Sequence, residues 1–176
     1  GGNMFPCGTF VSTKNKVVIA YRDSGNFEYG TAVVGTVSGT SISFGTPVVF
    51  RSANAVPYDK SVVFDTNSNK VVISYAEAGN GYSVVGTVSG TSISFGTAVN
   101  FDNSVGYLAA AFDSTNNKVV VMYQAGENSD RGSDIVGTVS GTSNYFGSLY
   151  DFYSGTTTYT NAALAHQQEK LIDSSR

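Results

Sequence analysis

The strongest constraint on this chain is one stretch of 13 residues that occurs three times at a fixed spacing. VGTVSGTSISFGT occupies residues 34–46 and 85–97, and the altered form VGTVSGTSNYFGS occupies residues 136–148. The copies start at positions 34, 85 and 136, so the spacing is 51 residues both times. A constant period of this length is typical of proteins built from one repeated supersecondary unit. The chain is therefore expected to be an array of similar modules.

The repeated stretch itself predicts a β-hairpin. Ser38-Gly39 is a turn dipeptide between β-branched and aromatic residues. A two-residue turn at this dipeptide would place Val37 opposite Thr40. One face of the hairpin would then be bulky and apolar and the other small and mixed, so that large residues can pack against a neighbour's small ones. The bulky face would carry Val33, Val37, Ile42 and Phe44, with Gly35 leaving room for Ile42.

A second element also occurs three times. Each copy has a Phe, a polar loop rich in Asn and Ser, a Lys and a β-branched run that ends in Tyr, which indicates a second strand–turn–strand. The copies begin at Phe10, Phe64 and Phe112. Each unit therefore reads as four antiparallel strands, expected in the second unit near 60–65, 70–76, 82–89 and 91–95. The predicted organisation is one all-β repeat domain over 1–176, with units at about 8–57, 58–105 and 106–158 and an irregular tail at 159–176.

Composition excludes several classes of protein. Apolar residues make up 41% of the chain and charged residues 13%, which indicates a packed domain. The net charge is −3 with only 10 Lys and Arg, which argues against a nucleic-acid partner. There is no apolar run of about 18 residues, so no membrane span is expected. No cofactor and no metal site are expected, because spaced Cys/His ligands and phosphate-binding glycine patterns are both missing. A weak calcium site in a loop is the alternative.

Tandem units of four antiparallel strands, as read over residues 10–152, resemble the blades of Kelch-like and Asp-box-like β-propellers. The run Asp23-Ser24-Gly25-Asn26 matches part of the Asp-box pattern, whose Trp this chain lacks. The repeats are also similar to those of predicted marine phage and microbial surface proteins. The resemblance implies a propeller-like fold of three blades and a partial fourth, located outside the cell or on a virion.

The number of blades leads to a prediction about partners. Propellers usually have four to eight blades, so three do not close a ring. A homo-oligomer, or neighbouring repeats of a longer chain, is therefore expected to complete it. The alternative fold is a β-solenoid, since a 51-residue period equals three coils of 17.

A polar and aromatic cluster recurs at the end of the second strand of each unit. Tyr and Asn keep their places in all three copies, and loops at one end of a propeller face a common surface. Aromatic rings beside amide and carboxylate groups are typical of sugar-binding sites. The alternative is that Tyr ends the strand in solvent and Asn takes a positive φ in the turn. The candidate ligand-binding residues are Tyr21, Arg22, Asp23, Asn26, Tyr75, Glu77, Asn80, Tyr123, Gln124 and Asn128.

Three functions follow from this reading. The first is a non-enzymatic adhesion module that binds glycans through the repeated cluster. The second is a structural repeat that associates with copies of itself. The third is a propeller glycoside hydrolase using Asp23 and Glu77, since paired carboxylates perform such hydrolysis. No catalytic residue is predicted: His166 has no evident partner, and Cys7 matches the small packed positions of Ser61 and Ala109.

Overall fold

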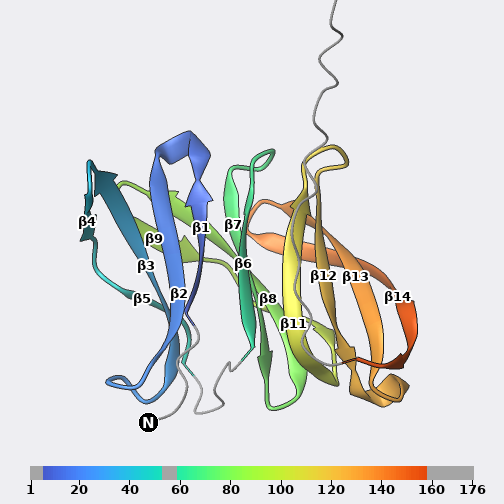
Figure 1. The fold of residues 1–176 in the computed structure, drawn as a ribbon. Helices are drawn as coiled ribbons and strands as arrows, with labels where there is room; N and C mark the ends of the chain where they lie inside the picture. The colour runs from blue at the N-terminus through green and yellow to red at the C-terminus, as the bar shows by residue number, and fades with distance from the viewer. Residues whose placement is uncertain (1–5, 53–58, 158–176) are drawn as a thin grey trace, which may run out of the picture.

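The computed structural model describes residues 6–52 and 59–157, and its strands form three antiparallel sheets that stand side by side in chain order (Figure 1). The first sheet contains β1 (Cys7–Val11), β2 (Lys16–Asp23), β3 (Tyr29–Ser38), β4 (Ser41–Phe44) and β5 (Val48–Arg51). The second contains β6 (Lys60–Asp65), β7 (Lys70–Glu77), β8 (Asn80–Ser89), β9 (Ser92–Phe95) and β10 (Val99–Asp102). The third contains β11 (Val105–Asp113), β12 (Lys118–Ala125), β13 (Arg131–Ser140) and β14 (Ser143–Thr156). Two short 3₁₀ turns, η1 (Ser12–Lys14) and η2 (Gly126–Asn128), complete the described elements.

The three sheets share one topology, which confirms the all-β prediction. In the first sheet the order is β1-β2-β3, and β4 and β5 both pair with the outer edge of β3. The second sheet repeats this order, and in the third the long strand β14 takes the place of both outer strands. Every strand pairing among the described residues is antiparallel. The β-solenoid alternative, which requires parallel coils, is therefore wrong.

The repeated hairpin forms as predicted, but its turn lies one residue later. Ser38 pairs with Ser41 and Val37 with Ile42, so Gly39-Thr40 is the two-residue turn. Gly39 has a φ of 59°, whereas Thr40 has no positive φ, as in a type II′ turn. The pairing differs from the predicted one by two residues, and side chains alternate with a period of two. The predicted bulky and small faces are therefore both retained.

The polar loops between the first two strands of each sheet explain the second repeated element. Asn15, Asn69 and Asn117 each adopt the left-handed conformation, with φ of 52°, 58° and 55°. Asn tolerates this conformation better than most residues. The following Lys then donates a hydrogen bond of 2.7 Å to a Thr hydroxyl of the third strand. The pairs are Lys16–Thr36, Lys70–Thr87 and Lys118–Thr138.

The sheets pack face to face, and each interface joins a small face to a bulky face. The small face of the first sheet lies in one core with the bulky face of the second. The small face of the second sheet lies in another core with the bulky face of the third. In the first core the small face provides Val18, Ala20, Ala32 and Val34, and the bulky face provides Phe64, Ile73, Tyr75, Val84 and Ile93. No other sheet of the described chain covers the bulky face of the first sheet or the small face of the third.

Candidate functional site

The three tyrosines predicted to face a common ligand occupy two different environments. Tyr75 and Tyr123 have no exposed surface, so the prediction that they present their rings to a ligand is wrong. Both lie on bulky faces that the preceding sheet covers. Tyr21 holds the same position on the first sheet, whose bulky face is covered by no sheet within residues 6–52 and 59–157, and it is half-buried. Burial, followed by the charge of Asp23, raises the pKa of the Tyr21 hydroxyl.

Three phenylalanines that the sequence reasoning missed occupy equivalent positions in the three sheets, and two of them account for this burial. Phe50, Phe101 and Phe152 are 51 residues apart, and each lies at a shift in the pairing of its strand with the sheet's third strand. Such a β-bulge re-aims a side chain. Each ring lies over a glycine of the neighbouring strand, 2.5–2.7 Å from where that glycine's Cβ would be. The glycines are Gly30, Gly81 and Gly132, so only a residue without a side chain admits the ring.

Two of these rings insert into the next sheet. The Phe50 centroid is 5.5 Å from that of Tyr75 and 5.8 Å from that of Phe95. The same arrangement joins the second and third sheets: the Phe101 centroid is 5.5 Å from Tyr123 and 5.2 Å from Phe146. The rings are tilted, as aromatic pairs prefer. Each Phe is therefore an aromatic knob held between a Tyr and a Phe of the following sheet.

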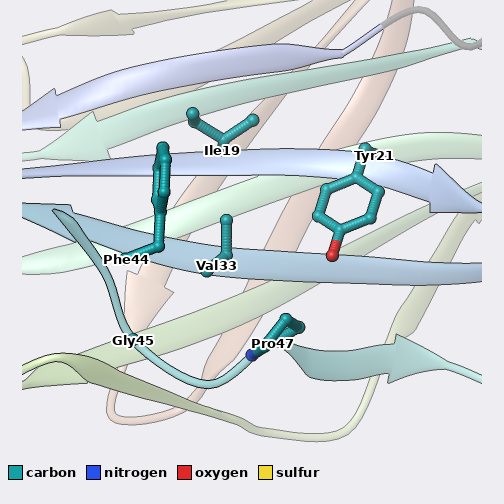
Figure 2. A pocket seen from close by; sticks show the side chains of 6 residues that line it. All are labelled: Ile19, Tyr21, Val33, Phe44, Gly45 and Pro47. Carbon is teal, nitrogen blue, oxygen red and sulfur yellow. The ribbon is translucent and has the colours of Figure 1, made fainter. Parts of the chain in front are cut away.

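The first sheet has the receiving residues but no knob. Tyr21 and Phe44 are the equivalents of Tyr75 and Phe95, and they lie at opposite ends of a hollow of about 330 Å³ (Figure 2). Ile19 and Val33 lie between them. The hollow is lined by Ile19, Tyr21, Val33, Phe44, Gly45 and Pro47.

The apolar side chains of the hairpin beside this hollow are much more exposed than their equivalents in the second sheet. Val37 is 49% exposed and Ile42 is 44% exposed. Their equivalents in the second sheet, Val88 and Ile93, are 7% and 3% exposed. Since the thirteen residues of the two hairpins are identical, the difference comes from the neighbouring sheet alone.

The polar candidates of the first loop serve the loop itself. Arg22 forms an ion pair with Glu28 at 2.5 Å. The Asp23 carboxylate accepts a hydrogen bond of 3.0 Å from the backbone of Gly25. The backbone carbonyl of Asn26 accepts a hydrogen bond of 3.0 Å from the backbone amide of Tyr29. The positive φ angles in this loop belong to Phe27 and Glu28, not to Asn26 as the alternative reading expected.

Glu77 is a structural residue that joins two sheets. It is 5% exposed and accepts two hydrogen bonds from Arg51 of β5, at 2.5 and 2.6 Å. The hydrogen bond to Glu77 raises the pKa of Arg51. Its neighbour Asn80 donates to the carbonyl of Ala78 at 3.4 Å. A buried and paired Glu77 is not free to act with Asp23 on a substrate.

The third loop forms a polar network around Asp151. The Asp151 carboxylate accepts hydrogen bonds of 2.8 Å from Asn128 and Ser133 and forms an ion pair with Arg131 at 3.1 Å. The hydrogen bond from Ser133 is the main cause of a pKa below the usual range for Asp151. The third candidate of this loop, Gln124, donates to the carbonyl of Thr157.

The loops after the second strands do lie along one edge of the molecule, the lower edge in Figure 1. Six of the polar candidate side chains nevertheless bond to neighbouring protein groups, and two of the three tyrosines lie inside the cores. The six are Arg22, Asp23, Glu77, Asn80, Gln124 and Asn128. The structure therefore does not bring the ten candidate residues together into one repeated site.

Other candidate groups lack the features of a reactive or metal-binding site. Cys7 is half-buried and packs at the edge of the first core, and burial raises the pKa of its thiol to about 11. Within the described residues no three His, Cys, Asp or Glu are grouped to hold a metal ion. No helix of the same residues is long and apolar enough to cross a membrane. His166 and the predicted partial fourth unit lie outside the described residues.

Comparisons of the chain with protein-family models, with curated proteins and with solved structures found no match.

Proposed function

We propose that the chain is a non-enzymatic structural module whose sheets are blades of a propeller-like array and whose terminal faces are association surfaces. The observation that carries this proposal is the uncovered bulky face of the first sheet. The same face is buried in the second and third sheets, where a preceding sheet covers it. The third sheet supplies the opposite kind of surface, a small face without a following sheet.

The size of the uncovered surface supports association. Phe10, Val37, Ile42 and Phe44 are each 44–54% exposed on one face of one sheet. Contiguous exposed apolar patches on soluble proteins typically mark interaction surfaces. Full burial of an exposed side chain of this kind contributes about 1.5–3 kcal/mol, and these four are about half exposed, so covering them contributes a few kcal/mol toward the cost of association.

The same proposal includes that each sheet is a blade of a propeller. Three four-stranded antiparallel sheets that stack small face on bulky face have the local arrangement of propeller blades, and a ring of four to eight needs more than three. The resemblance to phage and microbial surface repeats adds a location outside the cell or on a virion.

Analytical ultracentrifugation over a wide concentration range tests the association. We expect the native chain to associate and Val37→Glu to shift it to monomers, because a carboxylate on the bulky face would have to lose its water. Ser43→Glu is the matched control, since Ser43 is exposed on the other face of the same hairpin. A native chain that stays monomeric at all concentrations would contradict the proposal.

The hollow at Tyr21 favours a second candidate, glycan binding by an adhesion module. Its volume of about 330 Å³ lies within the range of small-ligand pockets, and Tyr21 and Phe44 provide aromatic rings for stacking. Asp23 follows two residues after Tyr21 on the same face of β2 and provides a hydrogen-bond acceptor. A glycan array with the native chain and Tyr21→Ala tests this candidate: loss of a specific signal in the variant supports it, and the absence of any signal excludes the sugars on the array.

A further inference from the structure

We propose that the partner is a second copy of this chain, docked head to tail, with Phe152 of one copy filling the hollow between Tyr21 and Phe44 of the other. The small face of the third sheet would receive the bulky face of the second copy's first sheet. This inference depends on the association proposed above and specifies its partner and orientation.

The first support is that the knob is already formed at the free end. Phe152 lies in a bulge of β14 over Gly132, and its ring is 2.6 Å from where a Cβ of Gly132 would be. Phe50 and Phe101 have the same bulge and the corresponding distances of 2.7 and 2.5 Å. Phe50 is 9% exposed because it is inserted in the next sheet, whereas Phe152 is 54% exposed. The third sheet therefore presents, at its uncovered face, the equivalent of the Phe side chain that inserts at each inner interface.

The second support is that the receiving hollow is formed at the other end. Phe50 contacts Tyr75 and Phe95, and Phe101 contacts Tyr123 and Phe146. The corresponding pair on the first sheet is Tyr21 and Phe44, which lie at the two ends of the hollow in Figure 2. Within one molecule, Phe152 and the hollow lie at opposite ends of the row of sheets. Phe152 can therefore fill a hollow only in another molecule, unless the fold rearranges.

A glycine contact gives a third, independent support. A Cβ on Gly45 would lie 1.8 Å from the carbonyl oxygen of Thr91, in the hairpin turn of the next sheet. A Cβ on Gly96 would lie 2.0 Å from the carbonyl oxygen of Thr142. The third equivalent, Gly147, has its nearest atom at 3.7 Å, within its own sheet. In the docked pair Gly147 would face the turn residue Thr40 of the second copy.

The rest of the third sheet's small face is partly adapted to such a neighbour. Val120 and Val136 repeat the valines that the small faces of the inner interfaces use. Asp134 departs from the pattern, because it stands where the first sheet has Ala32 and the second has Ser83. Asn144 donates to Ser83 at 3.2 Å across the second interface, and its equivalent on the first sheet is Ile42. Asp134 would therefore face an isoleucine of the second copy, which weakens the docking without blocking its shape.

The symmetry of this contact defines the assembly. A head-to-tail contact uses two different surfaces and generates a closed ring or an open filament. Two copies give six sheets, which lies within the usual range of four to eight blades. We therefore expect a closed dimer with two identical interfaces.

Gly147→Ala is the sharpest test, because it adds one methyl group where the single chain has room. Gly147 has no positive φ, so alanine is compatible with its backbone. We expect light scattering to show a dimer for the native chain and a monomer for Gly147→Ala, with unchanged thermal stability of the monomer. Ser148→Ala is the control on the neighbouring residue and should leave the dimer intact. Association that Gly147→Ala leaves unchanged would overturn the head-to-tail contact.

A mixing experiment tests the direction of docking. Phe152→Ala removes the knob and keeps the hollow, whereas Val37→Glu blocks the bulky face and keeps the knob. Each variant alone should be monomeric, and their mixture should form a species with one chain of each. If Phe152→Ala still associates, like faces meet and the inference is wrong, although association itself stands. If the native chain is monomeric throughout, the proposed function fails as well.

Discussion

The hairpins at 34–46 and 85–97 have the same sequence and differ in their surroundings. In the second sheet the bulky-face residues Val88 and Ile93 of this hairpin lie in a core, and in the first sheet their equivalents Val37 and Ile42 lie at the surface. Local sequence therefore sets the strand, the turn and the composition of each face, but not the burial of that face. The comparison measures what a neighbouring sheet contributes, because the covered copy shows which contacts the uncovered copy lacks.

The largest difference between covered and uncovered positions should appear at the tyrosines. Tyr75→Ala and Tyr123→Ala would each leave a cavity in a core, at a cost of about 3–5 kcal/mol in the free energy of unfolding. Tyr21→Ala should cost about 1 kcal/mol or less in the monomer, since its ring is half-exposed. Urea denaturation of the three variants at low protein concentration measures this. Equal losses at all three positions would mean that the bulky face of the first sheet is covered within the single chain.

The three glycines that follow the hairpins should show the next largest difference. Gly45→Ala and Gly96→Ala force a methyl group against a backbone carbonyl of the next sheet, and overpacking of this kind costs about 1–3 kcal/mol. Thermal unfolding should show a lower midpoint for both variants. Gly147→Ala, the same substitution without a neighbouring sheet, should leave the midpoint of the monomer unchanged. A loss of stability at Gly147 as well would show that the backbone, and not the interface, requires glycine there.

Removal of single hydroxyl groups should distinguish the two inner interfaces. The Tyr123 hydroxyl donates to Asp102 at 2.8 Å, whereas the Tyr75 hydroxyl is buried without a partner among the described residues. Tyr123→Phe should cost about 1.5–3 kcal/mol, because the lost hydrogen bond is to a carboxylate. Tyr75→Phe should be neutral or stabilising, because it removes a buried polar group that is not satisfied. Chemical denaturation resolves this contrast, and a clear destabilisation by Tyr75→Phe would mean that its hydroxyl does have a partner.

The sequence predicted the strands and both faces because these depend on short-range patterns. The period of 51 residues, the β-branched runs and the Asn-rich turns each act within one sheet. The turn at Gly39 was misplaced by one residue, since Ser38-Gly39 and Gly39-Thr40 both have a glycine that can take a positive φ. The alternation of side chains kept the faces correct despite this shift.

The candidate site could not be predicted because it depends on contacts between sheets. Tyr75 and Tyr123 end their strands beside polar loops, which suggested exposure, but the knobs Phe50 and Phe101 from the preceding sheets cover them. The recurrence of Phe at 50, 101 and 152 was visible as the same 51-residue period. Its meaning was not, because the bulge that aims each ring depends on the pairing of two strands.

The smallest expected effect concerns Asp134, the carboxylate that breaks the match between the small face of the third sheet and the small faces of the other two sheets. Burial, followed by the charge of Asp151, already raises the pKa of Asp134 above its usual range. Arg131 pairs with Asp151, and Lys118 and Asp113 lie farther along the same small face as Asp134. The ionisable residues on the bulky face of the first sheet are Tyr21, Asp23 and Tyr29, at the end away from Ile42. Docking would bury Asp134 further and raise its pKa again, since no cation faces it.

The sign of the pH dependence follows from this shift. A carboxyl group whose pKa is higher in the docked state favours docking when it is protonated. Association should therefore be strongest below the pKa of Asp134 in the free chain, which is already raised, and weaken as the pH rises from there to the still higher pKa of the docked state. At neutral pH Asp134→Ala, which restores the residue of the first sheet, should tighten the dimer by about tenfold, equivalent to about 1.4 kcal/mol. Sedimentation of both proteins across this pH range gives the comparison: the native dimer should weaken with rising pH and the Asp134→Ala dimer should not. A dependence that persists in the variant would place the titrating group elsewhere and leave Asp134 exposed in the assembly.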